Sequence, residues 1–234
     1  ENKKKNISLT ISGIGKFYSA IAVTHTFFEF GRIKNNVWIN LGLAGHKTLE
    51  IGEIVLVNKA KDNNNKMTFF PFFLNDYDIE NKNCITFDKQ NSLYNNSLSD
   101  MECSGFFFSA NKYSTKELIH SIKFISDNKK QTIDFKNKKI IYDIILKKIN
   151  KIDLFAKEIH EIKKKNFSNE NKLEKVIARL SKETKFTFYQ RNQLKKLLQI
   201  YFSKYTKFNN GLLKNEKDAN GRIQTLKKHL NYEF

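Results

Sequence analysis

The stretch "LSDMECSGFFFSA", residues 98–110, carries the signal that decides the fold. Two carboxylates, Asp100 and Glu102, flank a methionine directly before a run of small and apolar residues. The start of a helix favours an acid, because its free N–H groups carry partial positive charge. Asp100 alone is enough for that capping role. Glu102 therefore needs a second explanation, which has to come from the surrounding sequence.

Strand patterns lie on both sides of this predicted helix. Runs of β-branched and apolar residues predict strands over residues 7–15, 36–45, 49–60, 83–88 and 120–127. Another helical segment begins at Lys16, where apolar side chains recur at helical spacing. Pro71 is the only proline and argues against a central strand in its aromatic stretch. Strands that alternate with helices predict an α/β domain with three layers, αβα.

Beyond residue 138 the periodicity indicates helices only. We therefore expect an α/β domain over residues 1–165 and a C-terminal helical extension over residues 166–234. Thr187 and Gln190 have the spacing of a capping box at the start of a helix. Asn220-Gly221 predicts a turn before a last short helix.

The helical extension is strongly basic, with 15 Lys and Arg against 6 Asp and Glu. Such a segment can bind nucleic acid or an acidic partner. More often it is the solvated outer face of packed helices, and we favour that interpretation.

The whole chain carries a formal charge of +18, which invites a nucleic-acid interpretation. Only four of its 42 basic residues are arginines, however: Arg32, Arg179, Arg191 and Arg222. Arginine is the usual residue for recognition of phosphates and base edges. Lysine in excess beside abundant Asn, Ile and Phe is typical of nucleotide bias in a source genome. We therefore do not expect the chain to bind nucleic acid.

Other simple features exclude whole classes of protein. No apolar run approaches the roughly 20 residues that would cross a bilayer, so we expect no membrane partner. Cys84 and Cys103 are too few for a disulfide framework and predict two reduced thiols in a cytoplasmic protein. The five histidines are scattered without ligand spacing. We expect neither a metal nor a cofactor.

Three segments end predicted strands with small or acidic residues: "TISGIGK" (10–16), "INLGLAGH" (39–46) and "FISDN" (124–128). In α/β sheets, ligands gather at the carboxyl ends of strands. Glycines at such ends let a ligand approach the backbone. Each segment alone is a weak signal, but together with "DMECSG" (100–105) the set is much more specific.

These motifs resemble, in order and context, those of the purine and uridine phosphorylase superfamily. The closest resemblance is to its nucleosidase branch, the methylthioadenosine/S-adenosylhomocysteine nucleosidases, and it covers roughly residues 7–160. The resemblance implies a nucleoside phosphorylase-like fold, a purine nucleoside as substrate, and a homodimer. The helical extension is not part of the common family core.

The resemblance also implies a role for the second acid. Glu102 matches the family glutamate that accepts hydrogen bonds from the ribose hydroxyls, with Met101 packing under the sugar. Asp127 matches the aspartate that donates a proton toward N7 of the departing purine. The simpler alternatives are that Glu102 only stabilises the start of the helix through its charge and that Asp127 is only a capping residue.

Four further positions line the site by the same resemblance. Ser12 and Gly13 lie on the side of the ribose and the nucleophile, whereas Ala44 and Gly45 lie beside the base. The aromatic residue that should stack on the base is left open, with Phe87 as a candidate. We expect all these positions to surround one cavity shared by Glu102 and Asp127.

The chemistry of a nucleosidase requires such groups. Cleavage of an N-glycosidic bond passes through an oxocarbenium-like sugar. The base leaves easily only if its developing negative charge is neutralised, so a positioned acid is needed. An aspartate that donates at neutral pH must keep a proton or share one with the base nitrogen. A carboxylate can accept from both ribose hydroxyls at once, which explains Glu102.

Water is a better candidate for the nucleophile than phosphate. Family phosphorylases commonly have an arginine just before the glycine turn of the second motif, but "VWINLGLAG" has none, and Arg32 lies on the far side of that strand. The family core also begins with an upstream strand whose acid orients the water, and "ENKKKN" (1–6) does not supply it. A phosphorylase and a non-catalytic nucleoside-binding or scaffold protein therefore remain alternatives.

Overall fold

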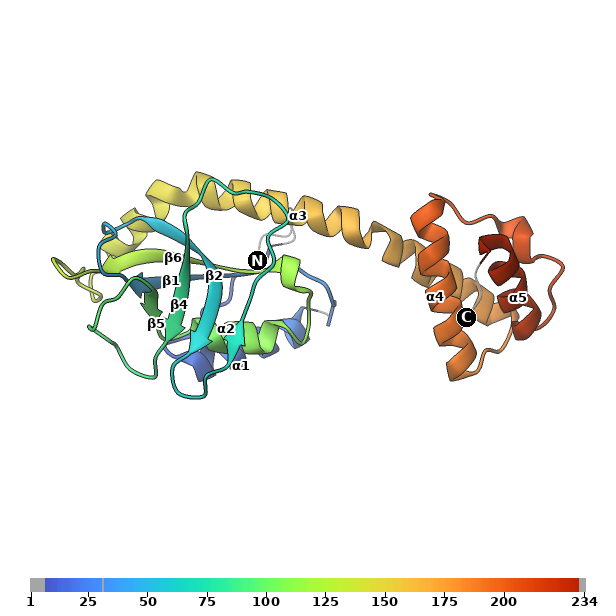
Figure 1. Ribbon diagram of the computed structural model, residues 1–234, viewed down its shortest axis with the longest axis horizontal. Helices are drawn as coiled ribbons and strands as arrows, with labels where there is room; N and C mark the ends of the chain where they lie inside the picture. Colours follow the sequence, from blue (N-terminus) through green and yellow to red (C-terminus); the bar gives the residue numbers. More distant parts are fainter. Residues whose placement is uncertain (1–6, 31, 232–234) are drawn as a thin grey trace. The chain divides into compact units, whose positions relative to one another are not determined.

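The computed structural model describes residues 7–30 and 32–231, without the side chains of residues 166–171. The expectations for residues 1–6 lie outside the described residues. The chain forms two compact units, Glu1–Lys163 and Lys164–Phe234 (Figure 1). Each unit has a hydrophobic core of its own.

The first unit is built on one mixed sheet. Its strands are β1 (Trp38–Gly45), β2 (Ile54–Asp62), β3 (Thr68–Phe69), β4 (Asn81–Thr86), β5 (Leu98–Asp100) and β6 (Ile119–Asp127). The order across the sheet is β3-β2-β4-β5-β1-β6, and β2 also pairs with β6. This extra pairing closes five strands into a ring, with the two-residue strand β3 outside it.

Helices cover the sheet on two sides. They are α1 (Lys16–Glu29), α2 (Cys103–Ala110), the short η1 (Lys116–Leu118) and the beginning of α3 (Lys138–Glu183). Figure 1 shows α1 and α2 on one side of the strands and the first part of α3 on the other. The expected αβα fold class is confirmed. The core of this unit joins buried residues of β2 and β6 to the buried face of α2, including Val57, Ile125 and Phe107.

The strand predicted over residues 7–15 is wrong. Only Ile7 makes a β-bridge, and residues 8–13 have no regular structure. Leu9 and Ile11 are 81% and 91% exposed. β-branched residues favour a strand only where a neighbouring strand takes up the backbone hydrogen bonds. In the closed ring β1 already pairs with β5 on one edge and with β6 on the other. Neither edge of β1 is therefore left to pair with a further strand.

Two other boundaries differ from the prediction. The strand expected over residues 49–60 begins only at Ile54, because Gly52 has a φ of 86° and forms a turn. The three residues before "MECSG" form the short strand β5, whereas their sequence pattern predicts only the approach to a helix. β5 matters for the site, because it joins β4 to β1.

The second unit contains the end of α3, α4 (Phe188–Lys204), η2 (Asn210–Leu213) and α5 (Ala219–Leu230). The capping box of Thr187 and Gln190 is confirmed by both of its hydrogen bonds. The turn predicted at Asn220-Gly221 is wrong, because both residues lie in the first turn of α5. Asp218 caps that helix by accepting a hydrogen bond from Gly221 N, so the helix begins earlier than expected.

Helices that could span a membrane are not found among residues 7–30 and 32–231, since none of them is both long and apolar enough.

Candidate functional site

The carboxyl end of β1 lies between the two segments that carry the predicted acids. Gly45 pairs with Ser99 of β5 on one side and with Asp127 of β6 on the other. β5 ends at Asp100, two residues before Glu102. The turn that carries Glu102 and the strand that carries Asp127 therefore flank the same strand end.

Asp127 is almost fully buried, with 6% of its surface exposed. Its Oδ1 accepts a hydrogen bond from Ser126 Oγ at 2.5 Å, and Tyr94 also hydrogen-bonds its carboxylate. A Cβ at Gly45 would lie 2.5 Å from Asp127 Oδ2 and 2.9 Å from a ring carbon of Tyr94. Glycine at position 45 therefore makes room for the carboxylate and the ring together.

Tyr94 is a site residue that the sequence analysis missed. Burial, and then the hydrogen bond to Asp127, raises the pKa of Tyr94 to about 12. The phenol is therefore protonated at neutral pH and donates to Asp127. Phe87, the candidate from sequence, instead lies beside the end of β5, where its N–H binds the carbonyl of Asp100. A lone aromatic residue in the polar stretch "NSLYNNS" was the available signal for Tyr94.

Glu102 meets the glycine turn before α1. Gly15 N donates a hydrogen bond to Glu102 Oε1 at 2.7 Å, across 87 positions of sequence. Gly13 and Gly15 have φ angles of 83° and 103°, which L side chains rarely adopt. Ser12 is half-buried and its hydroxyl donates to the carbonyl of Gly13 at 2.9 Å. The "TISGIGK" and "DMECSG" motifs are thus joined through the carboxylate of Glu102.

Asp100 organises the turn that holds Glu102. Its Oδ2 accepts hydrogen bonds from Glu102 N at 3.2 Å and Cys103 N at 2.8 Å, so it caps the start of α2. The side chain of Glu102 is therefore not needed to cap α2. Met101, between the two acids, is half-buried.

A lysine and two aspartates form an ion-pair network on the other side of the glycine turn. Lys16, the first residue of α1, lies 2.9 Å from Asp62 and 2.7 Å from Asp88. Burial works to raise the pKa of Asp62, but the ammonium of Lys16 and nearby N–H groups outweigh it, and the pKa is lowered. Ser104 of α2 also donates to Asp62 at 2.9 Å. This network fixes α1, β2 and α2 around the turn.

One cluster has the elements of a metal site, namely Cys84, Asp100 and Cys103, whose ligand atoms lie within 4.8 Å of one another. The ammonium of Lys123 lies 2.6 Å from Asp100 Oδ2, where a cation would bind. Burial raises the pKa of the Cys84 thiol well above its ordinary value, and the contact with Cys103 adds to this. A protonated Cys84 thiol and an ion-paired carboxylate do not make a metal centre.

The structure thus brings the predicted residues together in two groups. Ser12, Gly13, Met101 and Glu102 belong to the glycine turn and the turn after β5. Gly45 and Asp127 belong to adjacent ends of β1 and β6, and Ala44 is buried beside them. Within the described residues, no hydrogen bond links Glu102 directly to Asp127.

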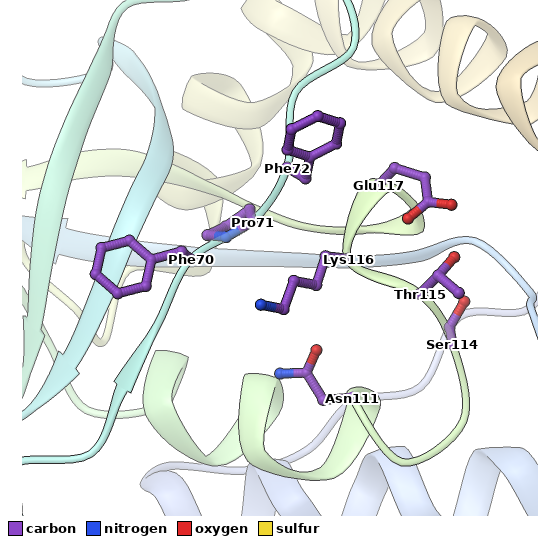
Figure 2. Close-up of a pocket in the computed structure, with 8 residues that line it drawn as sticks. All are labelled: Phe70, Pro71, Phe72, Asn111, Ser114, Thr115, Lys116 and Glu117. Carbon is purple, nitrogen blue, oxygen red and sulfur yellow. The ribbon is translucent and has the colours of Figure 1, made fainter.

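An open hollow elsewhere on the first unit is lined by other residues. They are Phe70, Pro71, Phe72, Asn111, Ser114, Thr115, Lys116 and Glu117. Figure 2 shows them around the segment after β3 and the turn after α2. None of the predicted site residues lines this hollow, so it is a surface separate from the candidate site.

No protein-family model matches the sequence, and no curated protein matches it. Among solved structures, the fold is similar to the methylthioadenosine/S-adenosylhomocysteine nucleosidase of Campylobacter jejuni, at 14% identity and a TM-score of 0.49. That match covers 62% of this chain and 79% of the nucleosidase.

Two further structures are similar at the same low level. A nucleosidase from Colwellia psychrerythraea 34H, solved with adenine, has 17% identity and a TM-score of 0.40, covering 50% of this chain and 63% of the other. The futalosine hydrolase of Helicobacter pylori has 14% identity and a TM-score of 0.44, covering 64% and 77%. The chain thus spans less than two thirds of the Colwellia protein. These similarities concern the backbone and leave activity to the chemistry of the site.

Proposed function

We propose that the chain is a purine nucleosidase that hydrolyses the N-glycosidic bond of a nucleoside such as methylthioadenosine or adenosine. The observation that carries the proposal is the pairing of Gly45 with Ser99 and Asp127 on its two sides. This arrangement joins the "DMECSG" and "ISDN" motifs at one strand end. The proposed activity belongs to residues 1–165, with residues 166–234 as a basic helical extension.

Asp127 is the proposed proton donor to the leaving base. Ser126 and Tyr94 donate hydrogen bonds to its nearly buried carboxyl group, and both would stabilise the carboxylate that is left when the proton passes to the base nitrogen. Glycine at position 45 lets the carboxyl group of Asp127 and the ring of Tyr94 lie close against the end of β1, and the base would lie beside them. Proton donation to the base typically contributes 10²–10⁴-fold to such a reaction.

Glu102 is the proposed acceptor for the ribose hydroxyls. Among the residues that the structure describes, Gly15 N is the one hydrogen-bond donor to its carboxylate, and a carboxylate can accept several hydrogen bonds. The ribose would lie between Glu102 and the turn of Ser12 and Gly13, with Met101 beneath it. Ala44 and Gly45 would border the base.

Hydrolysis is favoured over phosphorolysis by the position of the nearest arginine to the second motif. The guanidinium of Arg32 lies over the ring of Phe28 at 4.9 Å, at the far end of α1 from the glycine turn. A phosphate site would need such a fork of donors. Water therefore remains the proposed nucleophile.

A second copy of the chain is the proposed partner. Residues 7–14 run along α1, since Thr10 Oγ1 lies 2.7 Å from Thr26 Oγ1. A Cβ at Gly13 would contact Tyr18. The apolar surface so formed consists of Ile7, Leu9, Ile11, Ile14, Phe17, Tyr18, Ile21 and Phe28, all at least half exposed. It offers on the order of 1,000 Å², more than the roughly 800 Å² per partner of a standard interface.

We assign the enzyme to the cytoplasm, where free thiols such as Cys84 and Cys103 stay reduced.

The direct test of the activity is incubation with methylthioadenosine, adenosine and inosine, followed by chromatography of the released base. We expect free base and free sugar, at a rate that added phosphate does not change. Asp127→Asn should lower kcat by about 10²-fold or more, because the variant cannot supply the proton. Asp134→Asn, the same change at an exposed position, should have no effect.

Three outcomes would contradict the proposal. Sugar phosphate formed only with added phosphate would indicate a phosphorylase. Binding of nucleoside without turnover would indicate a non-catalytic binding protein. An unchanged rate in Asp127→Asn would remove Asp127 from the mechanism.

A further inference from the structure

A lysine lies in the interior of β6, where every other residue from Ile119 to Ile125 is apolar or small except His120. Lys123 is fully buried, as is its partner Asp100, and their charged atoms are 2.6 Å apart. Burying a lysine is costly unless an opposite charge compensates it. Such a pair in the core therefore needs a reason beyond stability.

The backbone makes room for this lysine at one position. A Cβ at Gly42 on β1 would lie 2.8 Å from Lys123 Nζ, and Gly42 pairs with Lys123 in the register of β1 and β6. The side chain thus crosses β1 over a residue without a side chain. It reaches Asp100 at the end of β5, on the other side of β1.

The oxygen that binds Lys123 is the one that holds the turn of Glu102. Asp100 Oδ2 faces the ammonium and also accepts from Glu102 N and Cys103 N. The other oxygen, Oδ1, accepts from Thr86 Oγ1 at 2.7 Å. The backbone of Glu102 is therefore tied, through Asp100 and Lys123, to the strand that ends at Asp127.

We propose that Lys123 is a positioning residue, which fixes the turn of Glu102 relative to the strand of Asp127 through its ion pair with Asp100. The inference rests on the proposed function, in which Glu102 holds the sugar and Asp127 meets the base. Lys123 touches neither part of the nucleoside. It sets the distance between the two carboxylates that do, and a misplacement of about 1 Å can cost 10²-fold in rate.

The test separates positioning from stability by neutralising both partners. Lys123→Met leaves Asp100 buried without its counter-charge and is expected to be unstable. The double variant Lys123→Met/Asp100→Asn removes both charges, so its stability should recover, as for other buried ion pairs replaced together. The double variant keeps an amide oxygen at position 100, which can still accept from the backbone of the Glu102 turn, but it loses the ionic link to β6. The Glu102 turn should therefore still be displaced relative to β6, although the stability has recovered.

The readout is calorimetric binding of two probes, adenine and a methylthioadenosine analogue with a non-hydrolysable bond. Glu102 faces only the sugar, so the double variant should bind the nucleoside analogue at least tenfold more weakly while its affinity for adenine is unchanged. In turnover, KM should rise by a similar factor and the pH dependence of kcat should stay the same. Lys163→Met, at a half-buried lysine that binds Asn36, is the matched control and should bind both probes like the wild type.

The outcomes distinguish this inference from the proposed function. Equal nucleoside affinity in the wild type and the double variant would overturn positioning alone. Equal loss of both probes would assign Lys123 a purely structural role and would also overturn it. A wild-type chain that binds neither probe would overturn the proposed function, and the role of Lys123 with it.

Discussion

Asp127 and Glu102 are both acids, but their surroundings prepare them for different tasks. Asp127 is nearly buried and accepts hydrogen bonds from the hydroxyl groups of Tyr94 and Ser126. In the proposed reaction these two hydroxyl donors would stabilise the buried carboxylate that remains once the proton has passed to the base. Glu102 is half-buried and its Oε1 accepts a hydrogen bond from Gly15 N; in the proposed complex its other oxygen would accept from the sugar hydroxyls.

His120 gives the first unit a pH-dependent stability. It is fully buried, with Nε2 against the carbonyl of Glu117 and its ring between Phe73 and Phe155. Burial lowers the pKa of His120 to about 4 from the ordinary 6.5. Between these values the unfolded chain binds more protons than the folded chain, so the free energy of unfolding falls as the pH falls.

We predict a loss of about 3 kcal/mol from His120 as the pH drops from 7 to 4. His120→Gln keeps a donor for the carbonyl of Glu117 but cannot titrate, so its stability should fall by that much less over the same range. Urea unfolding, followed by the fluorescence of the single tryptophan, Trp38, reports on this unit. Parallel pH curves for the wild type and the variant would contradict the prediction.

Sequence motifs suggest a task for residues such as Asp127 and Glu102, but they do not reveal a residue whose proposed task depends on a contact with a distant part of the chain. Asp127 and Glu102 lie in recognisable stretches. Lys123 and Tyr94 acquire their roles only when β6 lies beside β1 and the loop after β4 reaches Asp127. A lone charge in an apolar strand was a usable signal for Lys123, since a buried charge needs a partner.

At the scale of elements, α1 and α2 pack unusually closely. A Cβ at Gly105 would lie 1.9 Å from the carbonyl oxygen of Lys16 and 2.8 Å from its Cα. These are backbone atoms at the start of α1, so no side chain can move aside. Glycine at position 105 therefore sets the approach of the two helices that carry the glycine turn and the Glu102 turn.

Gly105→Ala should destabilise the first unit by about 3 kcal/mol or more, because the helices must separate to admit one methyl group. Phe108→Ala, on the same helix but half exposed, should cost less than about 1 kcal/mol. Urea unfolding monitored at Trp38 compares the two. A Gly105→Ala protein as stable as Phe108→Ala would show that the helices do not depend on this contact.

Most elements were predictable because local pattern and burial agree in them. β6 begins and ends within one residue of the expected places, and α1 begins at the expected residue, Lys16. The failure at residues 7–15 has a global cause, since a strand needs a vacant neighbour and the closed ring offers none beside β1. β5 was missed because three residues give too short a pattern, and its identity depends on β4 and β1.

At the scale of the molecule, the apolar surface of residues 7–14 and α1 should hold two copies together. We expect light scattering to give twice the 27.5 kDa of one chain. Ile11→Glu/Ile21→Glu should shift the protein to a monomer, because the charges would be buried at the interface. Phe188→Glu, at an equally exposed residue of α4, should leave the mass unchanged. A wild-type monomer at micromolar concentration would contradict this prediction.

The central claim is that two carboxylates far apart in the sequence serve one nucleoside. A crystal structure with a methylthioadenosine analogue bound is the most direct measurement. We predict one molecule beside Gly45, with its ribose hydroxyls on Glu102 and a base nitrogen within hydrogen-bond reach of Asp127. An analogue bound elsewhere, or touching only one of the two acids, would contradict the claim.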